Sequence, residues 1–337
     1  MRGAHVAPES LKPQYSRGHV RRRGVGYSLL IMGIGGILAA CGAAATPTAS
    51  PAAATPASPA AVTPAPPTAT PAPTALGTLA RVRADGTIRV GFANEAPYAY
   101  ASPDGKLVGI MPDVISYVMA QLGVPAVEGV LTEFGGLIPG LQAKRFDLLG
   151  AGLYVRPDRC EQVAPSNPEY TVGEGMVALK GNPKNLKSYP DIANSDAKIG
   201  TLSGSVNVEY LQISKVPDSR VVLFPDLPTA IAGLQAGRVD AVTMSAPSLQ
   251  DVLQKAGDSN LQMVDGFVDP VDKDGKATRG FGAAWFRLED TDLRDAYNAE
   301  LAKIIESGKL LELMAPYGFT KDQVPSVEVT AAKLCGN

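Results

Sequence analysis

Short apolar segments alternate with amphipathic segments from about residue 87 to about residue 307. Runs rich in Val, Ile and Leu predict strands, and apolar residues at a spacing of three and four predict helices. The expected strands are 87–91, 127–131, 148–149, 198–200, 220–224, 241–242 and 280–287, and the expected helices are 112–122, 135–143, from about 206, 228–236, 247–256 and 291–307. Strands that alternate with helices indicate open, largely parallel α/β sheets, whose ligands bind at the carboxyl ends of the strands.

An eight-residue pattern occurs twice in this region. Residues 140–147 read GLQAKRFD, and residues 233–240 read GLQAGRVD. Each copy lies where a predicted helix ends and the next strand begins, so each marks a tight helix-to-strand connection. Two equivalent connections predict two similar α/β lobes.

The amino-terminal segment has the pattern of an export signal. Three arginines at 21–23 precede an uncharged apolar stretch over 25–40, which is shorter than the roughly 20 residues of a membrane-spanning helix. The stretch closes with Leu38-Ala-Ala-Cys41-Gly, which resembles the lipobox of bacterial lipoprotein signal peptides, where the cysteine becomes the acylated first residue. We expect a signal peptide over residues 1–40 and lipidation at Cys41. An ordinary signal peptide with a cysteine there by chance is the alternative.

A low-complexity segment follows. Residues 42–75 contain 14 Ala, 9 Pro and 7 Thr in 34 positions, with no charged and no aromatic residue. Such a composition cannot bury enough apolar surface to offset the entropy lost on ordering. We expect residues 41–75 to be the lipidated cysteine and a disordered, partly extended tether that reaches on the order of 100 Å. The folded part then begins at about residue 76.

The amino-terminal segment also changes the charge balance. The 337 residues include 31 basic and 33 acidic ones, for a net charge of −2, but 6 basic residues, one acidic residue and both histidines precede Cys41. Removal of residues 1–40 leaves 25 basic residues, 32 acidic residues and no histidine. A histidine-free chain excludes Ser-His-Asp and Cys-His catalysis and imidazole metal sites. An acidic chain argues against nucleic-acid binding, and we expect neither a cofactor nor a metal.

Two of the three cysteines, Cys160 and Cys335, remain once Cys41 is assigned to a lipid. An even number of cysteines in an exported protein favours a disulfide, and two free thiols are the alternative. A bridge between these positions would close a long loop and contribute up to about 4–5 kcal/mol in the chain-entropy description.

Candidate ligand-binding residues follow three of the predicted strands. Glu95 and Tyr98 follow the first strand, Phe134 follows the second, and Tyr154 and Arg159 follow the third. Aromatic faces attract a delocalised cation, a carboxylate serves as its counter-ion, and an arginine binds a carboxylate through two hydrogen bonds. The five side chains therefore predict a cage for a small zwitterion.

These residues also have a purely structural interpretation. Tyr98 and Phe134 are compatible with core positions, because large aromatic side chains commonly fill cores. Arg159 is compatible with an ion pair to Asp158 or Glu161. The spacing alone leaves both interpretations open.

Another candidate lies between the strand at 198–200 and the helix from about 206. The segment Gly200-Thr-Leu-Ser-Gly-Ser205 offers backbone N–H groups and hydroxyls to an anion at a helix amino terminus. A serine that only caps the helix is an equally simple interpretation.

Residues 85–335 resemble the extracellular solute-binding proteins, family 3, of amino-acid-type ABC transporters, in particular the ectoine- and hydroxyectoine-binding proteins. The stretches that carry the resemblance are GVLTEF at 129–134, LIPGLQ at 137–142, RPDRCEQV at 156–163, KGNPK at 180–184, GLQA at 233–236 and EDTDLRD at 289–295. The resemblance implies a type II periplasmic-binding-protein fold, in which two α/β lobes with open, mostly parallel sheets enclose a ligand cleft. It implies a first lobe over 76–179 and 280–337, a second lobe over 180–279, and crossover strands near 178–181 and 266–282.

The resemblance also implies roles for the first-lobe candidates. Arg159 resembles the arginine that binds the ligand α-carboxylate across the family. Glu95, Tyr98, Phe134 and Tyr154 fall where ectoine binders carry an acidic residue and three aromatic residues around the cationic ring.

Two departures from the pattern of amino-acid binders favour a ring-delocalised cation. Ser245 stands where those proteins usually carry an Asp for the α-ammonium group, and Tyr154 stands where they commonly carry a Ser or Thr. The second-lobe contacts that the resemblance implies are Ser205 and Asn207.

The implied protein is a lipid-anchored, monomeric, extracytoplasmic solute-binding component of an ABC importer, in the periplasm or on the outer face of the cytoplasmic membrane. It captures an ectoine-like zwitterion by closure of the cleft and delivers it to permease subunits, without acting as an enzyme. A polar amino-acid-binding protein of the same fold is one alternative. A cyclohexadienyl-type dehydratase, with Glu95 as acid or base, is the other.

Overall fold

The computed structural model describes residues 77–271, 275 and 278–336. The signal peptide, the lipidation site Cys41 and the tether expected from the sequence lie outside these residues. All described residues belong to one compact unit within Thr70–Asn337. This unit contains two α/β lobes.

A five-stranded sheet forms the first lobe. Its strand order is β4 (Ala126–Leu131), β1 (Thr87–Phe92), β5 (Leu148–Leu149), β14 (Trp285–Phe286) and β6 (Ala164–Pro165). β1 pairs in parallel with β4 and β5, whereas β14 pairs antiparallel with β5 and β6. Because β1, β4 and β5 run in parallel, their carboxyl ends meet at one edge of the sheet.

The second lobe repeats this arrangement. Its strand order is β10 (Val221–Phe224), β9 (Ile199–Leu202), β11 (Ala241–Ser245), β8 (Glu174–Leu179) and β12 (Leu261–Met263). β9 pairs in parallel with β10 and β11, and β8 pairs antiparallel with β11 and β12. The two sheets therefore match strand for strand, and the expectation of two similar α/β lobes with open sheets is confirmed.

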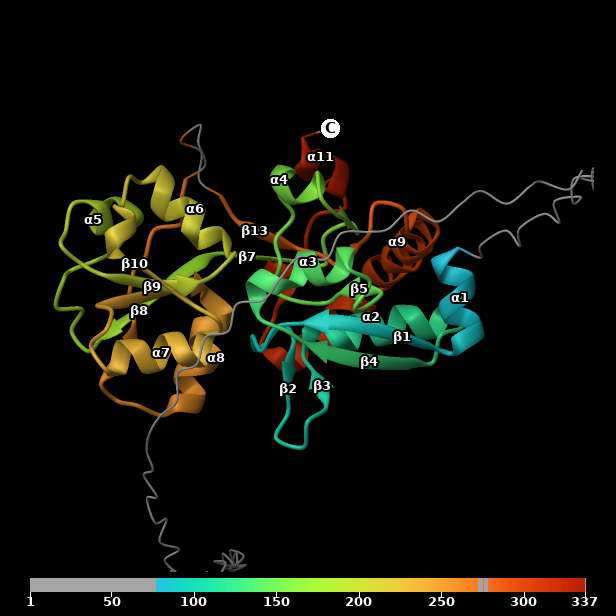
Figure 1. Ribbon diagram of the computed structural model, residues 1–337, viewed down its shortest axis with the longest axis horizontal. Coiled ribbons are helices and arrows are strands. Elements are labelled where there is room, and N and C mark those ends of the chain that lie inside the picture. Colours follow the sequence, from blue (N-terminus) through green and yellow to red (C-terminus); the bar gives the residue numbers. More distant parts are fainter. Residues whose placement is uncertain (1–76, 272–274, 276–277, 337) are drawn as a thin grey trace, which may run out of the picture. The chain divides into compact units, whose positions relative to one another are not determined.

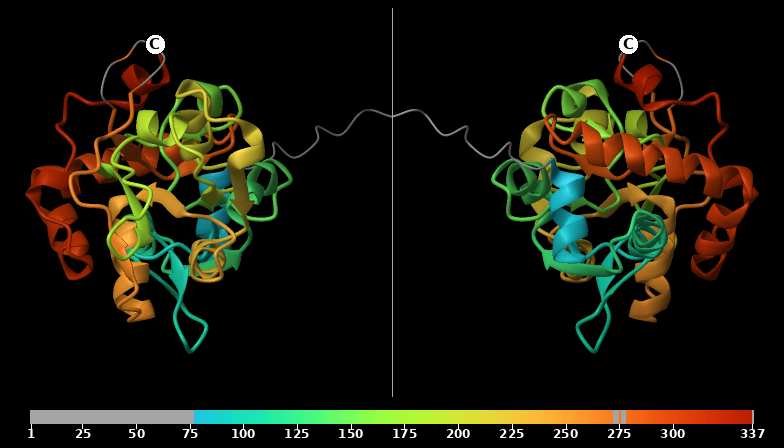
Figure 2. Two further views of the ribbon diagram at one scale, coloured as in Figure 1. Left: turned by 90° about the vertical axis from the view of Figure 1, so that its left-hand side faces the viewer. Right: turned by 90° about the vertical axis from the view of Figure 1, so that its right-hand side faces the viewer.

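Helices lie beside both sheets (Figure 1). Those of the first lobe are α1 (Thr78–Asp85), α2 (Ile110–Gln121), α3 (Leu137–Gln142), α4 (Pro157–Cys160), α9 (Thr291–Glu306), α10 (Lys309–Met314) and α11 (Ala331–Cys335), and those of the second are α5 (Tyr189–Ala193), α6 (Val206–Ile213), α7 (Leu227–Gln235) and α8 (Ala246–Ala256). Short 3-10 helices are η1 (Phe134–Gly136), η2 (Asp218–Arg220), η3 (Ala315–Tyr317) and η4 (Lys321–Gln323). A small hairpin, β2 (Tyr100–Ala101) with β3 (Leu107–Val108), projects from the first lobe (Figure 2).

The repeated sequence pattern has one conformation in both lobes. Lys144 and Gly237 occupy equivalent positions just after α3 and α7, and both have positive φ, 59° and 68°. A left-handed residue there turns the chain sharply from the helix into the next strand. Gly140 and Gly233 are also equivalent, since a Cβ atom at either would lie 2.7 Å or 2.6 Å from a phenylalanine ring of its own lobe.

The chain crosses between the lobes at a two-stranded antiparallel sheet, β7 (Tyr170–Val172) with β13 (Gly280–Gly282). β8 pairs with second-lobe strands throughout, so the first crossing comes before Glu174 and not near 178–181 as the sequence suggested. The single strand expected over 280–287 is interrupted, because β13 pairs with β7 while β14 pairs with β5 and β6. Figure 1 shows β7 and β13 running between the two lobes.

No helix within the described part of the chain is long and apolar enough to cross a membrane.

Candidate functional site

Glu95 lies in the turn that follows β1, at the carboxyl edge of the first sheet. The turn is fixed by its own backbone, since the Glu95 N–H donates to the carbonyl oxygens of Ala93 (2.7 Å) and Ala99 (3.0 Å). The carboxylate is only 2% exposed. Its pKa is raised to about 8, mainly because burial disfavours the charged form. A hydrogen bond from Ser248 opposes this effect and lowers the pKa. Its Oε2 atom is buried and has no hydrogen-bond partner among the described residues.

Two features of the neighbouring segment after β5 leave room for this turn and position Tyr154. A Cβ atom at Gly152 would lie 2.5 Å from the Glu95 carboxylate, so a glycine is needed for the close approach. The fully buried Trp285 indole donates from Nε1 to the Leu153 carbonyl oxygen at 3.1 Å. The residue before Tyr154 is thereby held to strand β14.

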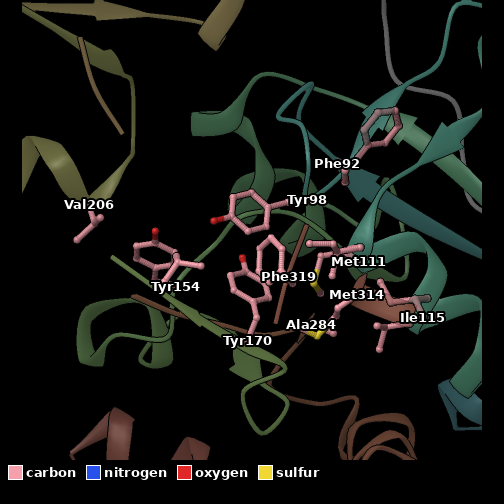
Figure 3. Packing of buried hydrophobic residues seen from close by; sticks show 14 of the residues in the cluster. Phe92, Tyr98, Met111, Ile115, Tyr154, Tyr170, Val206, Ala284, Met314 and Phe319 are labelled. Atoms are coloured by element: carbon pink, nitrogen blue, oxygen red, sulfur yellow. The ribbon is translucent and has the colours of Figure 1, made fainter. Parts of the chain in front are cut away.

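Three buried tyrosines, Tyr98, Tyr154 and Tyr170, belong to one hydrophobic cluster. The rings of Tyr98 and Tyr170 stack with centroids 4.8 Å apart, and Phe319 contacts both edge-on. Figure 3 shows these three rings in one group, with Tyr154 at its edge. The hydroxyls of Tyr98, Tyr154 and Tyr170 are all buried and lack a partner within the described residues. Tyr98 is thus both a core residue and a neighbour of the site, and Tyr170 is an aromatic that sequence reasoning missed.

Arg159 lies in α4 and is 6% exposed. Its guanidinium donates to the Tyr154 carbonyl oxygen at 2.8 Å and to the Gly204 carbonyl oxygen of the second lobe at 3.0 Å. Burial, its largest influence, lowers its pKa to about 10, so the group remains cationic at neutral pH. Asp158 pairs with Arg156 instead (2.9 Å), and Arg159 makes no ion pair within the described segments.

A small cavity of about 10 Å³ lies between the two lobes. It is lined by Glu95, Phe134, Gly152, Tyr154, Arg159, Ser205, Val206, Asn207, Met244 and Ser245. Six of the seven ligand-binding candidates expected from the sequence thus come together around one cavity. The seventh, Tyr98, is completely buried and does not line it, although its ring lies close to Gly152, which does.

The lobes also approach each other beside Phe134. Phe134 begins η1 and is 4% exposed, in accord with its double role as core and cavity residue. A Cβ atom at Gly135 would lie 3.3 Å from the Ser203 carbonyl oxygen of the second lobe, and one at Gly204 would lie 3.0 Å from the Gly135 Cα. Glycines at these two positions therefore relieve crowding between the two main chains, and Gly204 also has a positive φ of 78°, which favours glycine.

Ser205 and Asn207 stand at the amino terminus of α6. Ser205 occupies the N-cap position, but its side chain makes no capping hydrogen bond and pairs with the Thr201 hydroxyl at 3.0 Å. The Asn207 amide nitrogen donates to Glu174 Oε2 at 2.6 Å and to the Tyr189 hydroxyl at 2.9 Å. The Asn207 side chain is therefore fixed by hydrogen bonds within the second lobe.

Sequence reasoning missed two polar residues beside the cavity, Glu174 and Ser248. Glu174 begins β8 and is 6% exposed, and burial is the main cause that raises its pKa to about 7. Ser248, in the first turn of α8, donates to Glu95 Oε1 at 2.9 Å and accepts from Ser245 at 3.0 Å. Ser248 lies three residues after β11 ends at Ser245, but the strand expected from the sequence ended at 242, so no sequence signal marked Ser248.

Cys160 and Cys335 form a disulfide with a Cα–Cα distance of 5.8 Å. It joins α4, which carries Arg159, to the last helix of the described chain.

The chemistry of this cavity suits a ligand with both charges. It brings one guanidinium, one carboxylate with a free oxygen and two aromatic rings to the same small volume. Within the described segments, no group of His, Cys, Asp and Glu side chains could hold a metal ion.

Comparison with known proteins agrees with this geometry. A family model described as bacterial extracellular solute-binding proteins, family 3, matches residues 88–321. The "Probable amino-acid ABC transporter periplasmic-binding protein y4tE" of Sinorhizobium fredii is 36% identical over 263 residues, which cover 77% of this chain and 86% of that protein. The L-arginine-binding protein of Pseudomonas aeruginosa is 28% identical over 243 residues, which cover 71% of this chain and 91% of that protein.

Solved structures show the same fold. The crystal structure of EhuB in complex with hydroxyectoine is 37% identical, has a TM-score of 0.71, and is matched over 97% of its chain and 77% of this one. The ancestral amino acid-binding protein AncCDT-1, described as a precursor of cyclohexadienyl dehydratase, is 25% identical with a TM-score of 0.62, and 71% of this chain and 99% of that chain are covered. These structures confirm the type II periplasmic-binding-protein fold expected from the sequence.

The family match, the paired lobes and the cavity between them lead to one assignment: this chain belongs to the bacterial extracellular solute-binding proteins of family 3, as the solute-binding component of an amino-acid-type ABC transporter.

Proposed function

We propose that this protein captures ectoine, hydroxyectoine or a closely similar zwitterion in the cleft between its lobes. The observation that carries the proposal is the joint presence of Arg159 and the Glu95 carboxylate at one small cavity with Phe134 and Tyr154. A cyclic amidinium with an attached carboxylate matches this set of side chains. The likeness to a hydroxyectoine complex at 37% identity supports the same choice.

Each side chain has a distinct role in this proposal. Arg159 binds the ligand carboxylate with its planar fork of donors. Glu95 Oε2 accepts a hydrogen bond from the ring N–H. Phe134, Tyr154 and Tyr98 provide the aromatic faces that a delocalised cation favours. Ser205 and Asn207 complete the site from the second lobe.

Capture requires the lobes to move. A cavity of about 10 Å³ holds about one water molecule, so an organic ligand enters only when the lobes separate. The β7–β13 pair is the connection about which they separate. A ligand that contacts both lobes binds the closed form better than the open form, and this difference drives closure.

We propose further that residues 1–40 are a lipoprotein signal peptide, that Cys41 carries the lipid, and that residues 42–75 tether the folded part to the membrane. The folded part acts as a monomer and delivers its ligand to the permease subunits of the importer. Its first lobe runs from about 76 to 172 and from about 283 to 337, and its second from 174 to about 279.

Calorimetric titration of the purified protein with ectoine and with hydroxyectoine tests this function. We expect tight binding with one ligand per chain. Heat with a standard amino acid but none with either ectoine would establish the amino-acid-binding alternative in its place.

The dehydratase alternative has one observation in its favour. The raised pKa of Glu95, about 8, suits a general acid or base. We propose a non-enzymatic role nonetheless, because capture and release need no chemical step. Incubation with a cyclohexadienyl carboxylic acid, followed by chromatography, should show no product.

A further inference from the structure

Glu174 contributes a second buried carboxylate beside the cleft, from the lobe opposite Glu95. In the antiparallel pairing of β8 with β11, Glu174 stands directly opposite Ser245, which lines the cavity. Side chains of directly opposite residues emerge on the same face of a sheet. The Glu174 side chain therefore leaves its strand on the face that carries the cavity.

The hydrogen bonds of Glu174 are incomplete. Its Oε2 atom accepts from the Asn207 amide nitrogen at 2.6 Å. Its Oε1 atom is buried and has no partner within the described residues, just as Glu95 Oε2 has none. A buried carboxylate oxygen without a donor is costly, and its natural complement is an N–H group that arrives with a ligand.

We propose that Glu174 is a second specificity-determining residue of the cleft, which acts with Glu95 to select a zwitterion whose cationic group carries N–H donors toward both lobes. This inference rests on the proposed function, and it narrows the ligand class. Ser245 is uncharged and stands where amino-acid binders usually carry an Asp. Glu174, directly opposite Ser245 on the neighbouring strand, supplies a carboxylate in its place.

The charged and titratable groups around Glu174 define its electrostatic setting. Asn207 of α6 fixes one oxygen, and the Glu174 N–H donates to the Asp269 carboxylate at 2.9 Å. The Tyr154 hydroxyl of the first lobe and the Tyr189 hydroxyl of α5 also lie close enough for the Glu174 charge to raise their pKa, after burial, which is the largest cause for both. The Glu174 charge also raises the pKa of Tyr210 in α6 and of Glu95, again after burial, the largest cause for both. No cationic side chain forms an ion pair with Glu174 in the described part of the protein.

A cationic ligand between Glu95 and Glu174 should therefore release protons. At pH 7 both carboxyl groups carry protons for part of the time, because burial raises their pKa to about 8 and about 7. An adjacent cation favours the ionised form and lowers both pKa values. Proton release on binding is a readout that a merely structural role of Glu174 would not produce.

The test compares Glu174→Gln with wild type in calorimetric titrations with ectoine, repeated in buffers of different ionisation enthalpy. We expect Glu174→Gln to weaken binding about 10- to 100-fold and to reduce the number of protons released. Glu169→Gln is the matched control, because Glu169 is also buried and also has a pKa raised to about 7. Its hydrogen-bond partners, Ser166, Ala284 and Tyr297, do not line the cavity, whereas Asn207, the partner of Glu174, does. The affinity and proton release of Glu169→Gln should stay at wild-type values. Glu174→Asp, which keeps the charge, should retain proton release even where its affinity is lower.

Several outcomes would overturn the inference. Equal affinity and equal proton release in Glu174→Gln and wild type would do so, as would an equal loss of affinity in both Gln variants. Tight binding of glycine betaine, a quaternary ammonium zwitterion without N–H donors, would also contradict it. If wild type binds another solute and not ectoine, the proposed function fails, and the same variants measured with that solute decide the role of Glu174. Absence of binding by any zwitterion with an N–H cation would refute both.

Discussion

The Ser248 hydroxyl donates to Glu95 Oε1 at 2.9 Å across the cleft, although the two residues are 153 positions apart in the chain. Ser248 belongs to the first turn of α8 in the second lobe, and Glu95 to the turn after β1 in the first. Ser245 extends the connection by donating to Ser248 at 3.0 Å. The acidic residue proposed to bind the ligand is thus oriented by the opposite lobe, and only while the lobes are together.

Ser248→Ala should weaken ligand binding about tenfold, because a hydrogen bond to a charged group is lost from the closed form alone. Titration calorimetry measures the change. Ser307→Ala, at the end of α9, removes a remote serine and should leave the affinity unchanged. Wild-type affinity in Ser248→Ala would show that this contact does not favour closure.

Arg159→Ala should lower the affinity more than a hundredfold, since the ligand carboxylate loses its bidentate partner. The melting temperature should change little, because loss of two hydrogen bonds to carbonyl oxygens is offset by relief of a buried charge. Arg145→Ala, at an exposed site after α3, is the control for loss of one positive charge. Comparable binding by Arg159→Ala and Arg145→Ala would remove Arg159 from the site.

The melting temperature of the ligand-free protein should fall as the pH rises from 5 to 9. The pKa of Glu95 is raised to about 8, far above its ordinary value, so the folded state holds a proton that the unfolded state has lost within this window. Glu169 and Glu174, both raised to about 7, act in the same direction.

Glu95→Gln removes the group whose pKa is raised most, from 4.5 to about 8, and should reduce this fall by about 10 °C. The exposed carboxylate in Glu128→Gln serves as the control and should leave the slope unchanged. Differential scanning fluorimetry across the pH range measures all three proteins. A slope in Glu95→Gln as steep as in wild type would contradict the raised pKa.

Removal of the disulfide in Cys160→Ser/Cys335→Ser should lower the free energy of unfolding by about 2–4 kcal/mol, because the bridge closes a loop of 175 residues in the unfolded chain. For a chain of this size, that corresponds to a fall in melting temperature of about 5–15 °C. The affinity should change less than about threefold, since neither cysteine lines the cavity. Identical melting of the variant and the oxidised wild type would argue against the bridge in solution, and wild type with reductant provides an independent check.

The candidate site was predictable from the sequence where it depends on topology. Parallel strands bring their carboxyl ends to one edge, so the order of strands along the chain is enough to group Glu95, Phe134 and Tyr154. Glu174 and Ser248 were not predictable in this way, because their positions depend on the β8–β11 register and on the distance between the lobes.

The helices and strands were likewise predictable where local periodicity defines them and not where long-range strand pairing does. Strands and helices with clear periodicity lie within about two residues of their expected bounds, for example β1, α7 and α9. The broken strand over 280–287 and the early crossing before Glu174 depend on which distant strand each segment pairs with. Pairing over such sequence distances leaves no local signature in hydrophobic periodicity.

Trp285 is the only tryptophan of the chain, and it is completely buried. Its indole hydrogen bond to the Leu153 carbonyl oxygen places it one residue from Tyr154. The tryptophan emission of the native protein, excited selectively over that of its 11 tyrosines, therefore originates at a single point one residue from Tyr154. This chain carries its own optical probe of the Tyr154 segment, with no label needed to follow ligand capture in real time.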